Sequence, residues 1–310
     1  MKKRVLCVGA AVLDTIFRVR ELPKGEGKIL PYEMVQIAEG MASSAAYAVV
    51  RLGGDATLWG AVGADETGER ICRELGGDGI DISEMTRVVG APSALSTILV
   101  DDRGDRLIVP FYDARLHADP PAFTAEQIGG FHAVLVDVRW PTLAGRVLAE
   151  ARRVGVPAIL DGDVAPPEIL ETLARMADHI IFSEPAARLL STAEQEDELV
   201  LELSGRFPEA MVCVTFGAGG AYWAPQGSTT VFHQPALAIT PVDTLAAGDA
   251  FHGAFALAVA EELGIDQAIR LGSVTAALKC EVFGGRRGMP SRATAENTLK
   301  RLPELVLINQ

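Results

Sequence analysis

The amino-acid sequence predicts an α/β fold, in which a doubly wound and mostly parallel sheet carries helices on both faces and a small β-sheet forms a lid. Three observations support this prediction. Between residues 133 and 216, apolar strand-like runs alternate with helical segments, which is typical of a parallel sheet. These runs are apolar on both alternating faces, as in strands covered from both sides. Two segments nearer the N-terminus alternate apolar and polar residues instead, which indicates half-exposed antiparallel hairpins.

The composition and charge of the chain are typical of a globular protein that binds neither membranes nor nucleic acids. The chain has 310 residues, of which 49% are hydrophobic and 22% charged, enough for a large core with at most a small appendage. No apolar run reaches the roughly 18 residues that cross a bilayer, and no signal peptide precedes the first strand, so we expect a cytoplasmic protein without a membrane partner. The net charge of −13 argues against nucleic-acid binding. The four cysteines lie far apart in the sequence, which predicts free thiols rather than zinc ligands or disulfides.

The first third of the chain contains both predicted hairpins. Residues 4–9 form a predicted buried strand, and residues 10–35 a hairpin whose second strand is expected at 29–35. Residues 40–53 are mostly small and predict a helix, which either lies close to a ligand or only packs on the sheet. A second hairpin is expected at 91–112, and the two together predict the lid. The main domain then comprises residues 1–9, 36–90 and 113–310, and the lid residues 10–35 and 91–112.

The remaining elements alternate along the chain. Strands are expected at 134–138, 157–161, 179–183 and 211–216, with helices at 143–153, 167–176 and 194–205. Ligands of such sheets bind beyond the carboxyl ends of the strands. The residues that fall there are Asp14, Asp137, Arg139, Asp161, Asp163, Ser183, Glu184, Thr215 and Gly217. The glycine-rich residues 217–220 run into strand-like residues, whereas a dinucleotide-binding loop must open a helix, so that motif is rejected.

A loop and a buried helix near residue 248 organise the predicted site. Residues 243–248 are small, polar or turn-forming, and residues 250–263 are rich in Ala, Phe, Leu and Val on every side, which predicts a buried helix. Its first N–H groups and its dipole favour a phosphate or an oxyanion. Asp249 stands at this end of the helix. Its carboxylate is either a simple N-terminal cap or a base that accepts a proton from a hydroxyl while the adjacent amides hold the developing charge.

Residues 243–249, Asp-Thr-Leu-Ala-Ala-Gly-Asp, resemble the Asp-Thr-x-Gly-Ala-Gly-Asp signature of the ribokinase (PfkB) carbohydrate kinases, with Ala246 where the family usually has Gly. The similarity continues through residues 48–54, 60–65 and 214–217, so it spans essentially the whole chain. The resemblance implies a ribokinase-like fold and an ATP-dependent kinase that uses Mg²⁺, with K⁺ as a further option. It implies a lid that covers the sugar and pairs with a second lid in a homodimer.

The resemblance also implies residue roles. Asp249 would be the base, and the amides of Ala246, Ala247 and Gly248 would stabilise the transferred phosphoryl group. Sugar hydroxyls would contact Asp14, Gly40 and Ser44. The nucleotide would lie near Thr215, Gly217, Glu184, Lys279 and Gly285, although residues 215–217 alone also fit a plain hairpin turn. Asp243 would be a ligand of the monovalent cation.

Two departures from the family pattern bear on the substrate. Glu39 and Ser44 replace a Gly and the sugar-binding Asn, while Ser183 and Ala186 replace the Asn and Glu of a magnesium-linked motif, which leaves only Glu184. Several runs, at residues 136–140, 160–163, 182–185 and 278–280, resemble the 6-deoxy-6-sulfofructose kinase branch. In that branch a Lys and an Arg at the positions of Lys28 and Arg139 help to hold the sulfonate, together with an Asn that is Pro110 here.

The sequence therefore leaves several candidate substrates. An anionic ketose such as 6-deoxy-6-sulfofructose is the leading candidate if Lys28 and Arg139 hold its anionic group. Arg139 could instead only pair with Asp137, Asp161 or Asp163. The alternatives are a kinase for a neutral sugar, of ribokinase or fructokinase type, a kinase for a nucleoside or a sugar phosphate, and a sugar-sensing protein without catalysis.

Overall fold

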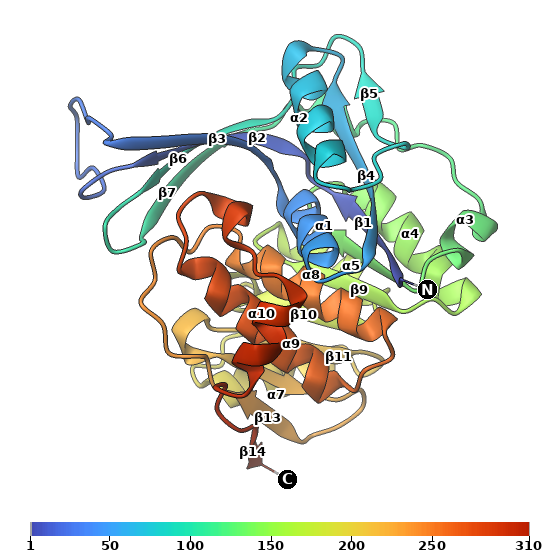
Figure 1. Ribbon diagram of the computed structural model, residues 1–310. Helices are drawn as coiled ribbons and strands as arrows, with labels where there is room; N and C mark the ends of the chain where they lie inside the picture. The colour runs from blue at the N-terminus through green and yellow to red at the C-terminus, as the bar shows by residue number, and fades with distance from the viewer. Residues whose placement is uncertain (1, 310) are drawn as a thin grey trace.

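A ten-stranded sheet forms the centre of the computed structural model, which describes residues 2–309 (Figure 1). Its strand order is β14-β13-β12-β11-β10-β9-β8-β1-β4-β5. Neighbours pair in parallel from β11 to β5, while β12, β13 and β14 add an antiparallel edge. The strands are β1 (Arg4–Gly9), β4 (Asp55–Gly63), β5 (Thr86–Val88), β8 (Ala133–Asp137), β9 (Ala158–Gly162), β10 (His179–Ser183), β11 (Met211–Thr215), β12 (Ala221–Ala224), β13 (Val231–Gln234) and β14 (Val306–Asn309).

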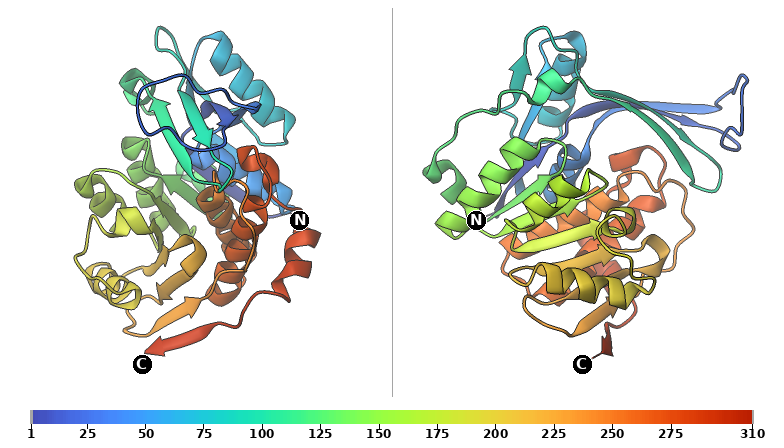
Figure 2. Two further views of the ribbon diagram at one scale, coloured as in Figure 1. Left: turned by 90° about the vertical axis from the view of Figure 1, so that its left-hand side faces the viewer. Right: turned by 180° about the vertical axis from the view of Figure 1, so that it is seen from behind.

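Helices cover both faces of this sheet, as the two views in Figure 2 show, so the predicted fold class is confirmed. They are α1 (Met41–Arg51), α2 (Glu66–Gly77), α3 (Ala125–Gly129), α4 (Pro141–Val154), α5 (Pro167–Ala174), α6 (Glu184–Ala187), α7 (Glu196–Arg206), α8 (Ala247–Ala260), α9 (Ile265–Cys280) and α10 (Arg292–Leu299), with the 3₁₀ turns η1 (Ala114–His117), η2 (Gly217–Gly219) and η3 (Gly285–Gly288). Helices α4, α5 and α7 end within two residues of the predicted bounds. No helix in residues 2–309 is long and apolar enough to span a membrane.

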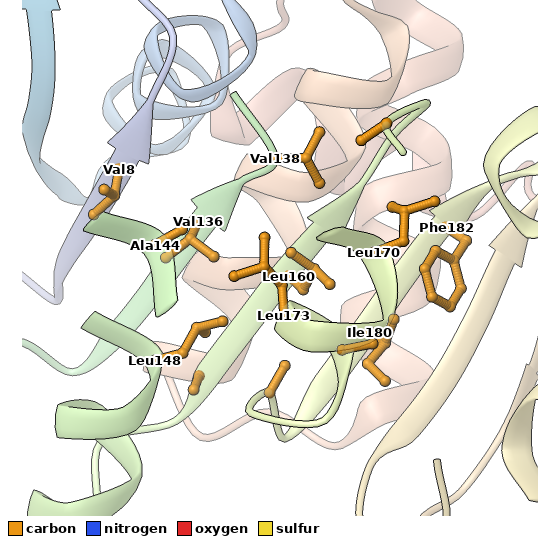
Figure 3. Packing of buried hydrophobic residues seen from close by; sticks show 14 of the residues in the cluster. Val8, Val136, Val138, Ala144, Leu148, Leu160, Leu170, Leu173, Ile180 and Phe182 are labelled. Atoms are coloured by element: carbon orange, nitrogen blue, oxygen red, sulfur yellow. The ribbon is translucent and has the colours of Figure 1, made fainter. Parts of the chain in front are cut away.

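The core divides between the two faces of the sheet. On β1, Leu6 and Val8 belong to one hydrophobic cluster, and Val5 and Cys7 to the other, because successive side chains of a strand point to opposite faces. Figure 3 shows Val8 with other members of the first cluster, which come from the central strands and from α4 and α5. Burial on both faces explains why these strands lack polar alternation.

A four-stranded sheet, the lid, projects from the main body (Figure 1). Its order is β3-β2-β6-β7, formed by β2 (Val12–Arg18), β3 (Glu33–Glu39), β6 (Leu95–Val100) and β7 (Arg106–Phe111). Both predicted hairpins are therefore present, joined through a parallel pairing of β2 with β6. The predicted strand at 29–35 is wrong by four residues. Pro31 lies in that segment and has no N–H for a strand ladder, so residues 19–32 form a loop.

This shift carries the lid strand β3 four residues past the predicted lid boundary at residue 35. The inner face of the lid packs on the main body through a small cluster that includes Ile16, Ile37, Ile98 and Phe283. The division of the chain into main domain and lid stays a prediction.

Helices α1 and α8 pack closely side by side. A Cβ atom added to Gly253 of α8 would lie 2.3 Å from the carbonyl oxygen of Ala45 in α1, a distance that no side chain tolerates. The small residues of α1 thus allow close helix packing. Of the two interpretations of residues 40–53, a ligand contact or tight packing, the structure contains the packing.

Candidate active site

Polar side chains predicted at strand ends do meet at one edge of the sheet. Asp137 and Asp161 are register partners at the carboxyl ends of β8 and β9, and Ser183 and Thr215 are partners on β10 and β11. The pKa of Asp161 is raised well above its ordinary value by burial and by the neighbouring charge of Asp249. The strand-end cluster and the start of α8 therefore share one electrostatic environment.

The loop before α8, residues 243–248, presents backbone donors and is called the anion loop below. Ala246 precedes the helix with φ 60°, a left-handed conformation that costs about 1 kcal/mol for a residue other than Gly. The N–H groups of Ala246 and Gly248 have no partner among residues 2–309, whereas Ala247 N–H donates to Thr244 O at 3.3 Å. Two of the three predicted phosphoryl donors are thus free, and Ala247 is not.

Asp249 lies in the first turn of α8. The helix cap is Ala246, and no side chain caps this end, so the interpretation of Asp249 as a simple cap is wrong. Its carboxylate is half-buried and makes no side-chain hydrogen bond within the described chain. Burial, followed by the charges of Glu39 and Asp163, raises its pKa well above the ordinary value. A raised pKa suits a group that accepts a proton from a hydroxyl.

Asp14 faces the site from the inner side of the lid. It accepts a hydrogen bond from Ser96 Oγ, and burial together with the charge of Glu39 raises its pKa to about 7. Gly40, at the start of α1, has φ 114°, and a Cβ there would lie 2.4 Å from Ala10 O. Only glycine fits this junction between the lid and the main body.

Glu39 is a site residue that the sequence analysis did not assign. It is 2% exposed, accepts hydrogen bonds from Ser44 Oγ and from Arg286 N, and acts electrostatically on Asp14 and Asp249. Burial raises its pKa. The predicted sugar ligand Ser44 therefore directs its hydroxyl at Glu39. The signal for Glu39 was an acidic residue where the family pattern has glycine.

Tyr112 is a second missed residue. Partial burial raises the pKa of its hydroxyl to about 12, and the charges of Arg139, Asp137, Asp14 and Asp249 all act on it. It follows β7 directly, so the lid supplies an aromatic side chain to the same site. Nothing in its sequence neighbourhood marks this position.

The two cations predicted to hold an anionic substrate have different surroundings. Arg139 Nη2 donates to Asp163 Oδ2 at 3.0 Å, and its Nη1 donates to Val164 O at 3.0 Å. Arg139 therefore forms the ion pair that was the alternative to anion binding, with Asp163 as its partner. Lys28 is exposed in the loop between β2 and β3 and has no ion-pair partner within residues 2–309.

The nucleotide side is built from the ends of β10 and β11. Thr215 Oγ1 donates to Phe182 O at 3.5 Å, and Gly217 has φ 55° with open space beside it. Glu184 pairs with Arg188 at 2.9 Å on the surface of α6. Within the described residues, no three His, Cys, Asp or Glu side chains gather as a metal site. Thr215, Gly217 and Glu184 stay predictions as nucleotide contacts.

The contacts of Lys279, Asp243 and Gly285 differ from their predicted roles. Its ammonium is fully buried and donates to Asp243 O at 2.7 Å, so it is not available to a nucleotide. Asp243 accepts hydrogen bonds from the N–H groups of Gly284 and Gly285. Its carboxylate is therefore stabilised by donors of the chain and does not need a monovalent cation as a partner. The N–H of Gly285 is likewise engaged, and only the rest of that residue could face a nucleotide.

The lid reaches the anion loop at its tip. Arg106 Nη1 donates to Thr244 Oγ1 at 2.6 Å, and Thr244 Oγ1 donates to Gly104 O at 3.1 Å. Gly104 lies in the turn between β6 and β7. The lid is therefore connected to the main body at both ends, through its strands and through this contact.

The chain matches known proteins over most of its length. The model of the pfkB family carbohydrate kinases matches residues 2–292. A crystal structure from Agrobacterium tumefaciens, whose description proposes a ribokinase, is 60% identical, covers 97% of this chain and 98% of its own, and has a TM-score of 0.95. Ribokinase of Bacillus subtilis is 29% identical over 300 residues, 96% of this chain and 99% of its own. Arabidopsis thaliana ribokinase, complexed with ribose and ATP, shares the fold, with a TM-score of 0.82 at 24% identity and coverage of 97% and 99%.

Proposed function

This chain belongs to the pfkB family of carbohydrate kinases, and we propose that it transfers the γ-phosphoryl group of ATP to a hydroxyl of a neutral sugar such as a pentose or a ketohexose. The observation that carries the proposal is the start of α8. There, the carboxylate of Asp249 has no hydrogen-bond partner in the described chain, and the free N–H groups of Ala246 and Gly248 lie beside it. The names of the relatives, ribokinases among them, agree with this substrate class.

Phosphoryl transfer mainly requires positioning and charge stabilisation. Asp249 accepts the proton of the attacking hydroxyl, and the free amides of the anion loop together with the α8 dipole stabilise the charge on the phosphoryl oxygens. Mg²⁺ binds largely through the phosphates of the nucleotide and needs only one or two carboxylates. Glu184, exposed at the end of β10, fits that requirement. When bound, the ion neutralises phosphate charge.

The charge of the site favours a neutral sugar. Burial raises the pKa of Asp14, Glu39 and Asp249, and the charge of Glu39 raises those of Asp14 and Asp249 further. Sugar hydroxyls are the donors that such carboxylates require. An anionic substrate would enter against this charge. Its expected partner, Arg139, is already paired with Asp163.

An anionic ketose such as 6-deoxy-6-sulfofructose is the second candidate. The observation in its favour is that the Arg139 side chain keeps 32% of its surface exposed. A sulfonate that displaced Asp163 would find a planar guanidinium with two donors. Lys28, in the exposed loop above, would then have to close onto the same group.

The deciding experiment measures ADP release with ATP, Mg²⁺ and a panel of neutral sugars, nucleosides, sugar phosphates and 6-deoxy-6-sulfofructose. We expect neutral sugars to give the highest kcat/KM. Tight sugar binding without ADP release would support a sugar sensor instead. Arg139→Met separates the two substrate classes, with Arg153→Met as a control, because Arg153 pairs with Glu150 on the surface of α4. A selective loss of roughly 2–5 kcal/mol on the anionic sugar alone would favour the sulfonated ketose.

We also propose that the protein is a homodimer joined through the lid. The outer face of the lid carries exposed apolar side chains from three strands, namely Met34, Leu95, Leu107, Val109 and Phe111. Met34 and Leu107 lie in one row of paired residues across the sheet, and Leu95 and Phe111 are direct partners. These rows are an even number of residues apart along each strand, so their side chains point to the same face. Soluble monomers rarely expose such a patch, and a second copy of the same face would cover it by two-fold symmetry. Sedimentation of a monomer at micromolar concentration would contradict this assembly.

A further inference from the structure

A fully buried lysine lies beneath the anion loop. Lys279 is in the last turn of α9, and its side chain has no exposed surface. The ammonium donates to the carbonyl oxygen of Asp243 at 2.7 Å and lies 3.4 Å from Asp243 Oδ2. Burial lowers the pKa of Lys279, while the charge of Asp243 opposes that effect. A buried cation is tolerated only with such partners.

The carboxylate of Asp243, next to this ammonium, accepts hydrogen bonds at both of its oxygens. Asp243 Oδ1 accepts from Leu245 N at 2.8 Å, and Oδ2 accepts from Gly284 N and Gly285 N at 2.9 Å each. A K⁺ ion in a protein replaces its hydration shell with several oxygens that point at it. Here N–H groups and an ammonium point at the same oxygens. The residues present therefore do not fit the monovalent cation that the resemblance suggested.

We infer that the ammonium of Lys279 is a resident cation that takes the place of a monovalent metal ion beneath the anion loop, so that stability and turnover do not require K⁺. The ammonium holds the carbonyl of Asp243, and the carboxylate of Asp243 holds the Leu245 amide. The ammonium of Lys279, which is part of the chain, thus stabilises the turn that leads to Ala246 and α8. This inference goes beyond the proposed function, and its thermal test needs neither sugar nor nucleotide.

The wild-type protein provides the first test. Thermal unfolding is measured in KCl, NaCl and tetramethylammonium chloride at equal ionic strength, and ADP release is measured in the same salts. We expect melting temperatures within about 1 °C and rates within about twofold of one another, because only general screening acts on the loop. A saturable rise of several-fold in rate, or of several degrees in melting temperature, with K⁺ alone would overturn the inference. If no sugar is phosphorylated, the thermal comparison still decides it.

Lys279→Ala provides the second test, with Lys300→Ala as the matched control at an exposed position. Removing the ammonium leaves the Asp243 carboxylate buried without its cation, so the melting temperature should fall by roughly 5 °C. KCl or NH₄Cl should restore part of the loss with saturation, whereas tetramethylammonium, whose methyl groups keep its charge away from the oxygens, should not. An unchanged melting temperature, or a loss that no cation restores, would overturn the replacement. If Lys279→Ala does not fold, Lys279→Met and the wild-type salt comparison provide the result.

Discussion

Replacing Asp14 with Asn should stabilise the protein and weaken its binding of sugar. Asp14 is 7% exposed, and the only hydrogen-bond partner of its carboxylate among residues 2–309 is Ser96. Burial and the charge of Glu39 raise its pKa from 3.8 to about 7. An ionised Asp14 is therefore a cost to the folded state, which Asn removes while it keeps the size of the side chain.

The size of the effect follows from the pKa. A tenfold change in proton affinity is worth about 1.4 kcal/mol, so a rise from 3.8 to about 7 corresponds to about 4 kcal/mol of destabilisation at high pH. A chain of 310 residues has an unfolding entropy of about 0.65 kcal/mol per kelvin. The full effect is then about 6 °C in melting temperature. Because Glu39 shares the repulsion, we expect a gain of about 3–6 °C.

The sign of the pH dependence is specific. A carboxyl whose pKa is raised on folding destabilises nothing below its unfolded pKa, and the cost grows as pH rises through the folded pKa. The gain from Asp14→Asn should thus be absent near pH 4, grow between pH 4 and 7, and be constant above. Calorimetry or thermal fluorescence of both proteins across this range measures it.

Asp113→Asn is the control, because the hydrogen bonds from Arg115 lower the pKa of Asp113 to about 2. The same substitution there should reduce stability slightly at neutral pH. Sugar affinity, measured by calorimetry with ribose and fructose, should fall only for Asp14→Asn, since Asn offers no charged acceptor to a hydroxyl. A variant that is less stable than wild type at pH 8, or a gain that persists at pH 4, would refute the reasoning.

Three further predictions concern the loop, the lid and the junction between them. Asp249→Asn should lower turnover at least about 100-fold with an unchanged or higher melting temperature, and turnover near the wild-type value would remove Asp249 as the base. Val109→Glu should give a monomer in sedimentation, whereas Val89→Glu, exposed outside the lid, should not; a dimer of the first variant would refute the lid interface. Gly40→Ala should cost roughly 2 kcal/mol or more in denaturant unfolding, because its φ is positive and its Cβ would meet Ala10 O. Gly129→Ala, in open space, should be neutral, and equal effects would refute this account.

Much of the fold was predictable because it follows from local periodicity. Apolar runs on both faces identified the parallel strands, and alternating runs identified the lid hairpins. The parallel pairing of β2 with β6 joins residues some 80 positions apart, and no local pattern encodes it. The position of β3 was wrong because Pro31 was included in the expected strand.

Side-chain partners were the part of the site that the sequence did not reveal. The strand ends and the start of α8 were located correctly, since topology brings them together. Arg139 with Asp163 and Lys279 with Asp243 are pairs between different elements, and a sequence offers several partners for each cation. Which pair forms depends on how the elements pack in the folded chain.

The contact between the lid tip and the anion loop has a kinetic consequence. Thr244 links Arg106 and Gly104 through two hydrogen bonds, each worth about 1 kcal/mol net. Breaking both costs about 2 kcal/mol, a factor of roughly 30 at room temperature, so these two bonds alone shift the equilibrium about thirtyfold towards the closed arrangement of lid and body. A sugar that needs this gate to enter or leave would exchange roughly thirtyfold more slowly than with an untethered lid.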